Sequence, residues 1–339
     1  MPDYRVGVMA DPGVPERIAA SMVRRLADKL SNSADTWRFS RFKGHLPVAP
    51  DGTIPITEHA PRLLEQNEWD FLVYLSDLPR FEGHSLLVYE MSNTTPAMTI
   101  FVPGHGALFQ VARVRRLIER VFRETSKSSW PPPRQRVPHG EVAGPLRTAR
   151  VLSGMVKSNR PGRMFSALSG CFAAGVASGA FGIFFGSVWP LSDVLPALRL
   201  MLISVIAIVT LTAWLLLRNR LWVGKKQPFY ICGSRLDNAS TILTVGLSVT
   251  LIHILLFAAL FILTLAVVDK EYFASQVGHE VGVLALAKLA WFSGSLGTLA
   301  GALGSNFDSR DAIEESTYSE RWNERRRLFE EQRDQERDR

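Results

Sequence analysis

Three short loops contain the residues with the clearest potential for ligand chemistry. Asp11-Pro-Gly13, Ser76-Asp77-Leu-Pro79 and Pro103-Gly-His-Gly106 each follow a short apolar segment. The first and third loops lead into predicted helices, whose N-terminal amides attract anions, and glycine lets a phosphate approach the backbone closely. The candidate ligand- or anion-binding residues are Asp11, Gly13, Asp77, Gly104, His105 and Gly106. Ordinary turn structure is the alternative interpretation, because Asp and Pro-Gly are also common turn residues.

No catalytic or metal-binding motif accompanies these loops. The sequence contains neither the G-x-G-x-x-G fingerprint nor the G-x-x-x-x-G-K-[ST] phosphate loop. The histidines of the N-terminal part lack the spacing of a zinc site, and the chain has only two cysteines, Cys171 and Cys232. We therefore predict no catalytic residue and no metal. No cofactor is required, a nucleotide is compatible with the loops, and enzymatic activity stays open.

An α/β domain over residues 1–125 must position the three loops. Short apolar segments predict its strands at 4–10, 37–42, 70–75, 85–89 and 97–102. Helical patterns follow the first loop as far as Leu30 and cover 57–66 and 107–124. This alternation predicts a mainly parallel, doubly wound, Rossmann-like sheet. The loops would then meet beyond the carboxyl ends of the strands, where such sheets bind ligands.

Four apolar stretches predict a bundle of four transmembrane helices. They cover residues 164–189, 195–217, 239–268 and 281–304. A helix needs about 20 apolar residues to cross the hydrocarbon core of a bilayer. Because that core offers no water to backbone amides, helices are the expected structure.

His253 and Lys288 are ionisable residues inside the predicted spans. His253 lies near the middle of the third span and Lys288 lies in the fourth. Such groups are costly in lipid and are therefore functional candidates. His253 is either a proton relay or ligand site, or a neutral partner in one interhelical hydrogen bond. Lys288 is either functional or extends to the outer surface.

The distribution of charge gives the orientation. The chain has a net charge of +7, and its basic residues cluster before the first span, after the second and after the fourth. Because basic residues remain on the inner side, both termini are expected in the cytoplasm of a multi-pass plasma-membrane protein. The N-terminus does not have the pattern of a signal peptide. The expected partners are the lipid bilayer and anionic lipid headgroups, rather than nucleic acid.

The segments that flank the bundle differ in composition. Residues 126–146 are proline-rich and predict a semi-rigid, mostly disordered linker. Residues 147–163 predict a basic juxtamembrane helix on the inner leaflet, or an extension of the first span. Residues 305–339 predict a charged, cytoplasmic helical tail.

Small residues recur at four-residue spacing in the first and fourth spans. Gly175 and Gly179 lie in the first, and Gly297 and Gly301 lie in the fourth. Such spacing lets helix backbones approach closely, either within the bundle or across a homodimer.

Several motifs resemble a group of actinobacterial multi-pass membrane proteins. The matching stretches are VGVMADPGVPERIA, WDFLVYLSDLPR, LSGMVKSNRP, GAFGIFFGSVW, NASTILTV and AGALGSNFD. Some members of that group carry the label 5,10-methylene-tetrahydrofolate dehydrogenase. The resemblance implies a membrane protein with a similar domain organisation, and no catalytic residue is carried over from it.

Three functions are compatible with these features. The first is a membrane-anchored sensory or scaffold protein whose α/β domain binds a ligand or partner. The second is a small transporter or channel, supported by His253 and Lys288, although no acidic residue accompanies them within the predicted spans. The third is a nucleotide-dependent oxidoreductase.

Overall fold

The computed structural model describes residues 3–31, 35–49, 53–82, 85–125, 130, 139–142, 147–159, 167–222, 233–305, 325, 327–331 and 333. Two compact units make up the chain. The first contains residues 1–159, 223–240 and 318–339, and the second contains residues 160–222 and 241–317.

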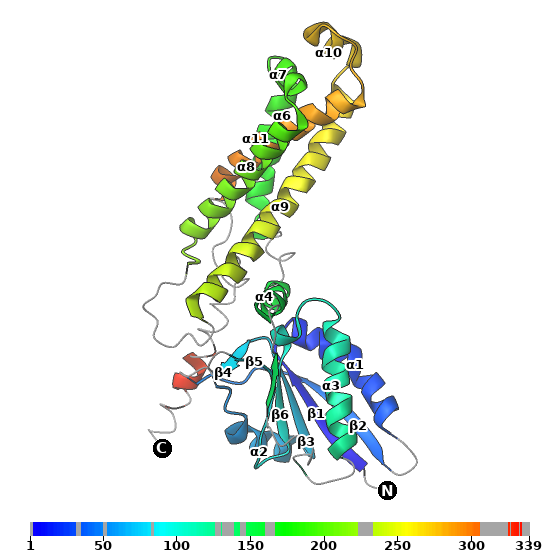
Figure 1. Cartoon of the computed structure of the whole chain (residues 1–339), viewed down its shortest axis with the longest axis vertical. Helices are drawn as coiled ribbons and strands as arrows, with labels where there is room; N and C mark the ends of the chain where they lie inside the picture. The colour runs from blue at the N-terminus through cyan, green and yellow to red at the C-terminus, as the bar shows by residue number, and fades with distance from the viewer. Residues whose placement is uncertain are drawn as a thin grey trace. The chain divides into compact units, whose positions relative to one another are not determined.

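The first unit is built around one mixed sheet of seven strands. Six strands lie in the order β2-β1-β3-β6-β5-β4, and β7 pairs with β5 (Figure 1). Their bounds are β1 Asp3–Ala10, β2 Thr36–Lys43, β3 Phe71–Ser76, β4 Arg80–Glu82, β5 Ser85–Met91, β6 Ala97–Phe101 and β7 His139–Val142. Strands β2, β1, β3 and β6 are parallel, whereas β5 runs antiparallel to β6, β4 and β7. The predicted α/β sheet is thus present, with an antiparallel edge that the sequence did not indicate.

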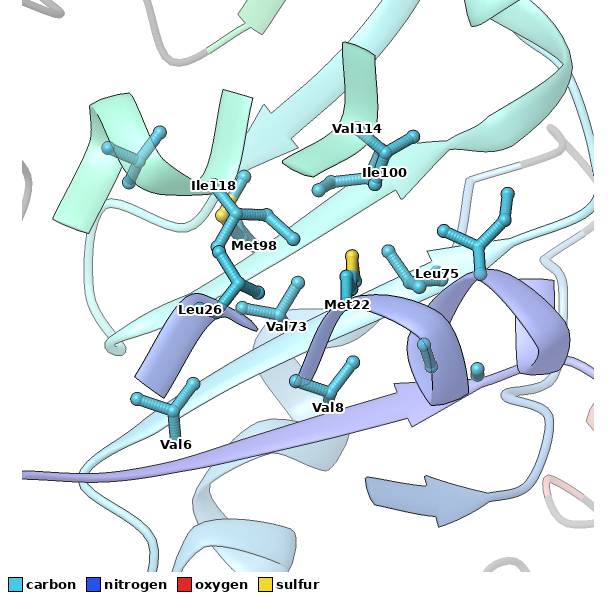
Figure 2. Close-up of a cluster of buried hydrophobic side chains, with 14 of the residues drawn as sticks. Val6, Val8, Met22, Leu26, Val73, Leu75, Met98, Ile100, Val114 and Ile118 are labelled. Atoms are coloured by element: carbon cyan, nitrogen blue, oxygen red, sulfur yellow. The ribbon is translucent and has the colours of Figure 1, made fainter. Parts of the chain in front are cut away.

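Helices cover both faces of this sheet. Helices α1 (Val14–Leu30) and α3 (Gln110–Thr125) lie on one face, and α2 (Ile56–Asn67) and α4 (Arg147–Ser158) lie on the other. Strand β3 shows why both faces are apolar, since its side chains alternate between the two cores. Val73 and Leu75 pack with α1 and α3, as Figure 2 shows, whereas Leu72 and Tyr74 face the opposite core.

Helix α4 belongs to the α/β domain. Val151 and Met155, which the sequence placed against the inner leaflet, are buried in the second core of the sheet. Gly154 allows the approach, because a Cβ atom there would lie 2.1 Å from the carbonyl oxygen of Pro103. Pro103 belongs to the short 3-10 helix η1 (Val102–His105). Protein therefore covers the apolar side of α4 that was expected to face lipid.

Part of the proline-rich segment is also folded onto the domain. Strand β7 adds to the sheet, and the indole Nε1 of Trp130 donates to the carbonyl oxygen of Ser92 at 2.9 Å. Trp130 also contacts the ring of Phe71 in the first core. The prediction of a mostly disordered linker is therefore wrong for these residues, and the rest of 126–146 lies outside the described residues.

The second unit is helical, and it contains most of the apolar sequence. Its helices are α6 Ser169–Phe184, α7 Val188–Val194, α8 Ala197–Arg218, α10 Lys270–Val277, α11 Val283–Gly304 and most of α9, Gly233–Val267. Among the described residues, α8, the Leu236–Val267 part of α9, and α11 are each long and apolar enough to cross a membrane. Many of their large apolar side chains are exposed, including Leu202, Ile206 and Ile262. These three helices are compatible with a membrane protein.

The stretch predicted as the first span is bent. Helix α6 and helix α7 meet at 92° across residues 185–187, so they form a fourth span only if the pair is counted as one broken span. The indole of Trp189 stabilises the bend, because its Nε1 donates to the carbonyl oxygen of Ile183 at 2.9 Å in a buried position. Within the described residues, the prediction of one continuous helix over 164–189 is therefore wrong.

Glycines bring α6 and α11 into backbone contact. A Cβ atom at Gly297 would lie 2.3 Å from the carbonyl oxygen of Gly175, and one at Gly304 would lie 2.2 Å from that of Gly170. These small residues therefore pack α6 against α11 within one chain. A homodimer through the same helices stays a prediction.

We expect Gly297→Ala to destabilise the second unit. The added methyl group would clash with the α6 backbone, and overpacking of this kind typically costs about 1–3 kcal/mol. Gly246→Ala in α9 is the matched control, because its methyl group would meet only Thr212, at ordinary contact distance. Thermal unfolding of the full chain in detergent should show a lower Tm for G297A alone. Equal Tm values for the two variants would contradict the close approach of α6 and α11.

Candidate functional site

The candidate site lies at the carboxyl ends of β1 and β3. The chain passes from β1 to β2 on one side and then crosses back to β3 on the other side of β1. Strands β1 and β3 are adjacent and parallel, with Ala10 opposite Leu75. Open α/β sheets bind ligands at such a reversal of strand order, and the β1–β3 crevice here denotes this point at the carboxyl ends of the two strands. Asp11 and Asp77 follow the two strands directly and therefore meet there.

Hydrogen bonds fix the carboxylate of Asp11 in this crevice. The backbone amide of Asp77 donates to Asp11 Oδ2 at 2.8 Å, and the hydroxyl of Tyr74 donates to Asp11 Oδ1. The Tyr74 oxygen in turn accepts from the backbone amide of Leu46 at 3.0 Å. All three side chains, of Asp11, Tyr74 and Asp77, are buried. The first two predicted loops therefore do form one cluster.

An arginine from the C-terminal tail fills the same crevice. Arg325 Nη2 donates to Asp77 Oδ1 at 2.7 Å and forms an ion pair with Asp11 Oδ2. Its Nη1 lies 3.4 Å from the Tyr74 oxygen, and its carbonyl oxygen accepts from Val48 at 3.4 Å. The Arg325 residue is only 4% exposed although its side chain carries a full charge. The crevice thus holds a guanidinium group in contact with two carboxyl groups and a phenol.

Burial sets the protonation of this cluster. Desolvation raises the pKa of Asp11 to about 7, against the attraction of Arg325, and the nearby Asp77 raises it further. Burial also raises the pKa of the Tyr74 hydroxyl well above its usual value. Burial opposes the charge of Arg325, but Asp11, Tyr74 and Asp77 together raise its pKa well above the usual value, so it stays charged. Near neutral pH the Asp11 carboxyl can therefore hold a proton beside a permanent cation.

The chemistry of this crevice suits a cation. Two carboxyl groups converge on one point, and a planar guanidinium group fits such a pair through directed hydrogen bonds. The neighbouring end of α1 already has an acidic group, because the backbone amide of Gly13 donates to Glu16 Oε2 at 3.5 Å. Gly13 itself has a φ of 114°, which explains the glycine by backbone conformation. A phosphate at this point would face carboxyl groups.

The third predicted loop is held by other partners. The ring of His105 is buried, and a Cβ atom at Gly104 would lie 3.0 Å from the carbonyl oxygen of Leu87 in β5. Arg113 and Arg150 are the charged neighbours of His105, and with burial they lower the pKa of its ring to about 4. This loop is therefore basic, whereas the β1–β3 crevice is acidic.

The two intramembrane candidates each have a hydrogen-bond partner. His253 Nδ1 lies 2.8 Å from Thr298 Oγ1, which joins α9 to α11. Lys288 Nζ donates to the carbonyl oxygen of Asp193 at 2.9 Å. The carboxylate of Asp193 in turn lies 2.7 Å from His279 Nε2, and the Glu280 carbonyl and this carboxylate raise the pKa of that exposed ring. Because Asp193 lies in α7, the contacts of His253 and Lys288 are both interhelical links.

Two members of the crevice were not found from the sequence. Tyr74 lies inside an apolar strand, where its ring is indistinguishable from an ordinary core residue. Arg325 lies among Arg326 and Arg327 in a highly charged tail, where a solvated helix face is the default interpretation. Only the fold brings a residue so distant in sequence to the end of β1.

The chain has no match among protein-family models, curated proteins or solved structures. Within the described part of the chain, no group of three His, Cys, Asp or Glu residues is placed to hold a metal ion. The function of the α/β domain must therefore be inferred from the geometry of the crevice.

We expect Asp11 to make folding stability depend on pH. Because its pKa in the folded chain is about 7 and that of an unfolded aspartate is 3.8, folding takes up a proton between these values. Its contribution to the free energy of unfolding should fall as pH rises from about 4 to about 7, by at most about 1.4 kcal/mol per pH unit. Urea unfolding of the full chain and of Asp11→Asn in detergent measures this slope.

The difference in the pH dependence of stability between the wild type and D11N reports on the crevice alone. D11N keeps an oxygen that can accept from Tyr74 but has no carboxyl to titrate, so its stability should vary less with pH. Asp28→Asn is the control, because Asp28 is exposed on α1. Equal slopes for the wild type and D11N would contradict the raised pKa of Asp11 in this site.

Proposed function

We propose that this chain is a membrane-anchored sensory or scaffold protein whose cytoplasmic α/β domain binds an arginine-bearing segment. The observation that supports the proposal is the guanidinium of Arg325 buried against Asp11 and Asp77 at the β1–β3 crevice. The helical unit anchors the domain in the plasma membrane, with both termini on the cytoplasmic side.

The construction of the crevice supports a binding role for it. Burying ionised groups is costly unless they are paired and hydrogen-bonded, and hydrophobic residues of the same volume are often as stabilising. Here the cluster lies at the ligand-binding edge of the sheet, and its cation comes from a tail distant in sequence. An intramolecular segment at this position can be exchanged for a partner that offers the same side chain. The tail therefore acts as a resident ligand, and a partner with an exposed arginine acts as its competitor.

The other two functions receive less support from the structure. Carboxyl groups occupy the crevice where an open α/β sheet usually binds the phosphates of a nucleotide, and they would repel those phosphates. His253 and Lys288, which supported transport, have hydrogen-bond partners in Thr298 and Asp193. Binding of a cationic segment, by contrast, uses the carboxyl groups of Asp11 and Asp77, which already contact a guanidinium group.

The experiment supplies the tail separately from the chain. The full chain carrying Arg325→Ala is placed in nanodiscs, and a fluorescent peptide of residues 318–333 is titrated into it. We expect the peptide to bind this variant and to bind the wild-type chain more weakly, because the wild-type crevice is occupied. A peptide with Arg325→Gln should bind at least about tenfold more weakly, since breaking a buried ion pair costs several kcal/mol.

A matched control peptide distinguishes binding in the crevice from nonspecific electrostatic attraction. Arg327 lies two residues further on the same tail and is exposed, so a peptide with Arg327→Gln should keep the wild-type affinity. Asp77→Asn in the R325A chain should weaken binding of the unmodified peptide. If the R325Q and R327Q peptides bind equally well, the proposal is wrong.

A further inference from the structure

Two large apolar side chains project from the loop before α3. Leu108 is 73% exposed and Phe109 is 75% exposed, although both are large hydrophobic residues in a domain with two well-formed cores. Phe109 has a φ of 54°, an unusual backbone conformation for a bulky residue, and such conformations are often found at functional sites. The pair is therefore held outward by the backbone of a loop that is packed on its other side.

Basic side chains surround the loop. Arg113 Nη1 donates to the carbonyl oxygen of His105 at 2.6 Å, and Lys157 Nζ donates to that of Ala107 at 2.7 Å. A Cβ atom at Gly106 would lie 2.9 Å from Arg150 Cγ and 3.6 Å from Arg113 Nη1. Two arginines from different helices, α3 and α4, therefore flank the same glycine. A lysine lies beside them.

The two arginines are arranged as partners for an anion. Burial and the charge of Arg113 lower the pKa of Arg150, which means that the guanidinium groups repel one another. Among the described residues, Arg150 Nε and the buried His105 Nε2 have no hydrogen-bond partner. A negative group placed between the two guanidinium groups would remove the repulsion between them.

Exposed apolar residues beside basic residues are the combination that binds a membrane surface. Apolar side chains enter the boundary between headgroups and acyl chains, and basic side chains bind anionic headgroups. In sequence, only residues 159–168 separate α4 from α6, so a short segment joins the α/β domain to the apolar helical unit.

We propose that the loop of residues 105–109 docks the α/β domain onto the anionic inner leaflet, with Leu108 and Phe109 in the lipid and Arg113 and Arg150 on a headgroup phosphate. This inference rests on the membrane-anchored placement in the proposed function, but it uses a separate site from the β1–β3 crevice. Docking would hold the domain in one orientation on the membrane. In this proposal the loop contacts the bilayer, whereas the sequence alone predicted that the apolar side of α4 would do so.

An environment-sensitive dye at position 109 tests the proposal. Cys171→Ala and Cys232→Ala remove the two natural thiols, and Phe109→Cys then carries an NBD label in the full chain. Nanodiscs of phosphatidylcholine alone are compared with nanodiscs that also contain phosphatidylglycerol. We expect the NBD emission to become brighter and blue-shifted only in the anionic discs, because the label enters lipid there.

Charge variants identify the residues that bind the headgroup. Arg113→Gln combined with Arg150→Gln should abolish the shift, whereas Arg123→Gln should keep it. Arg123 is the matched control because it is exposed on the same helix, about 15 Å further along its axis. For the chain with F109C as its only change besides the thiol replacements, high salt should reduce the shift, because headgroup attraction is screened. This measurement does not depend on the folding of the arginine variants.

Further outcomes overturn the inference or separate it from the proposed function. Equal emission in neutral and anionic discs would show that the loop does not enter an anionic surface. A response to inorganic phosphate in neutral discs would mean that the arginines bind a soluble anion, and would also overturn lipid docking. Tail-peptide binding reports on the crevice alone, so its loss with an intact NBD response would overturn only the crevice proposal.

Discussion

The structure of the first unit depends on how the buried positive charge of Arg325 is compensated. Arg325 loses almost all of its contact with water, and such a group is tolerated only when opposite charges and hydrogen bonds surround it. Asp11 and Asp77 supply the charge, and Tyr74 supplies a further polar contact. Removing one member leaves the others buried without compensation. The cluster therefore links the tail to the sheet more strictly than an apolar contact of the same size would.

The sheet topology explains why this charge lies at the end of β1. Parallel strands deliver their carboxyl ends to one edge, and the reversal of strand order keeps the loops after β1 and β3 from being covered by a crossover. Asp11 and Asp77 therefore face a shared crevice. The loop after β6 lies at the same edge of the sheet but packs against β5, α3 and α4, which give it the opposite charge. One edge thus carries an acidic site and a basic site with different expected partners.

In the helical unit the corresponding constraint is close backbone contact. Gly297 and Gly304 let α11 lie directly on the backbone of α6, where larger side chains would separate the helices. Polar contacts such as the one between His253 and Thr298 then join the helices at specific points. Both features are expected where lipid removes the hydrophobic driving force between helices.

Several features of the protein follow from the amino-acid sequence by itself. Alternating strand and helix patterns give the α/β sheet, and long apolar runs give the helices that can cross a membrane, because both signals are local. The positions of Asp11 and Asp77 after apolar strands also predict that their loops meet. The antiparallel strands β4 and β7 were missed, since β4 is very short and β7 lies in a segment dominated by proline.

Only the tertiary structure decided which residue packs against the loops after β1 and β3, and what covers the apolar side of α4. Arg325 resembles its neighbours in the tail, and nothing local distinguishes it until the fold places it beside Asp11. The apolar side of α4 is equally suited to lipid or to a sheet, and Gly154 settles the choice only once Pro103 lies against it. In each case the deciding energy is a contact between distant groups, which the spacing of residues along the chain does not encode.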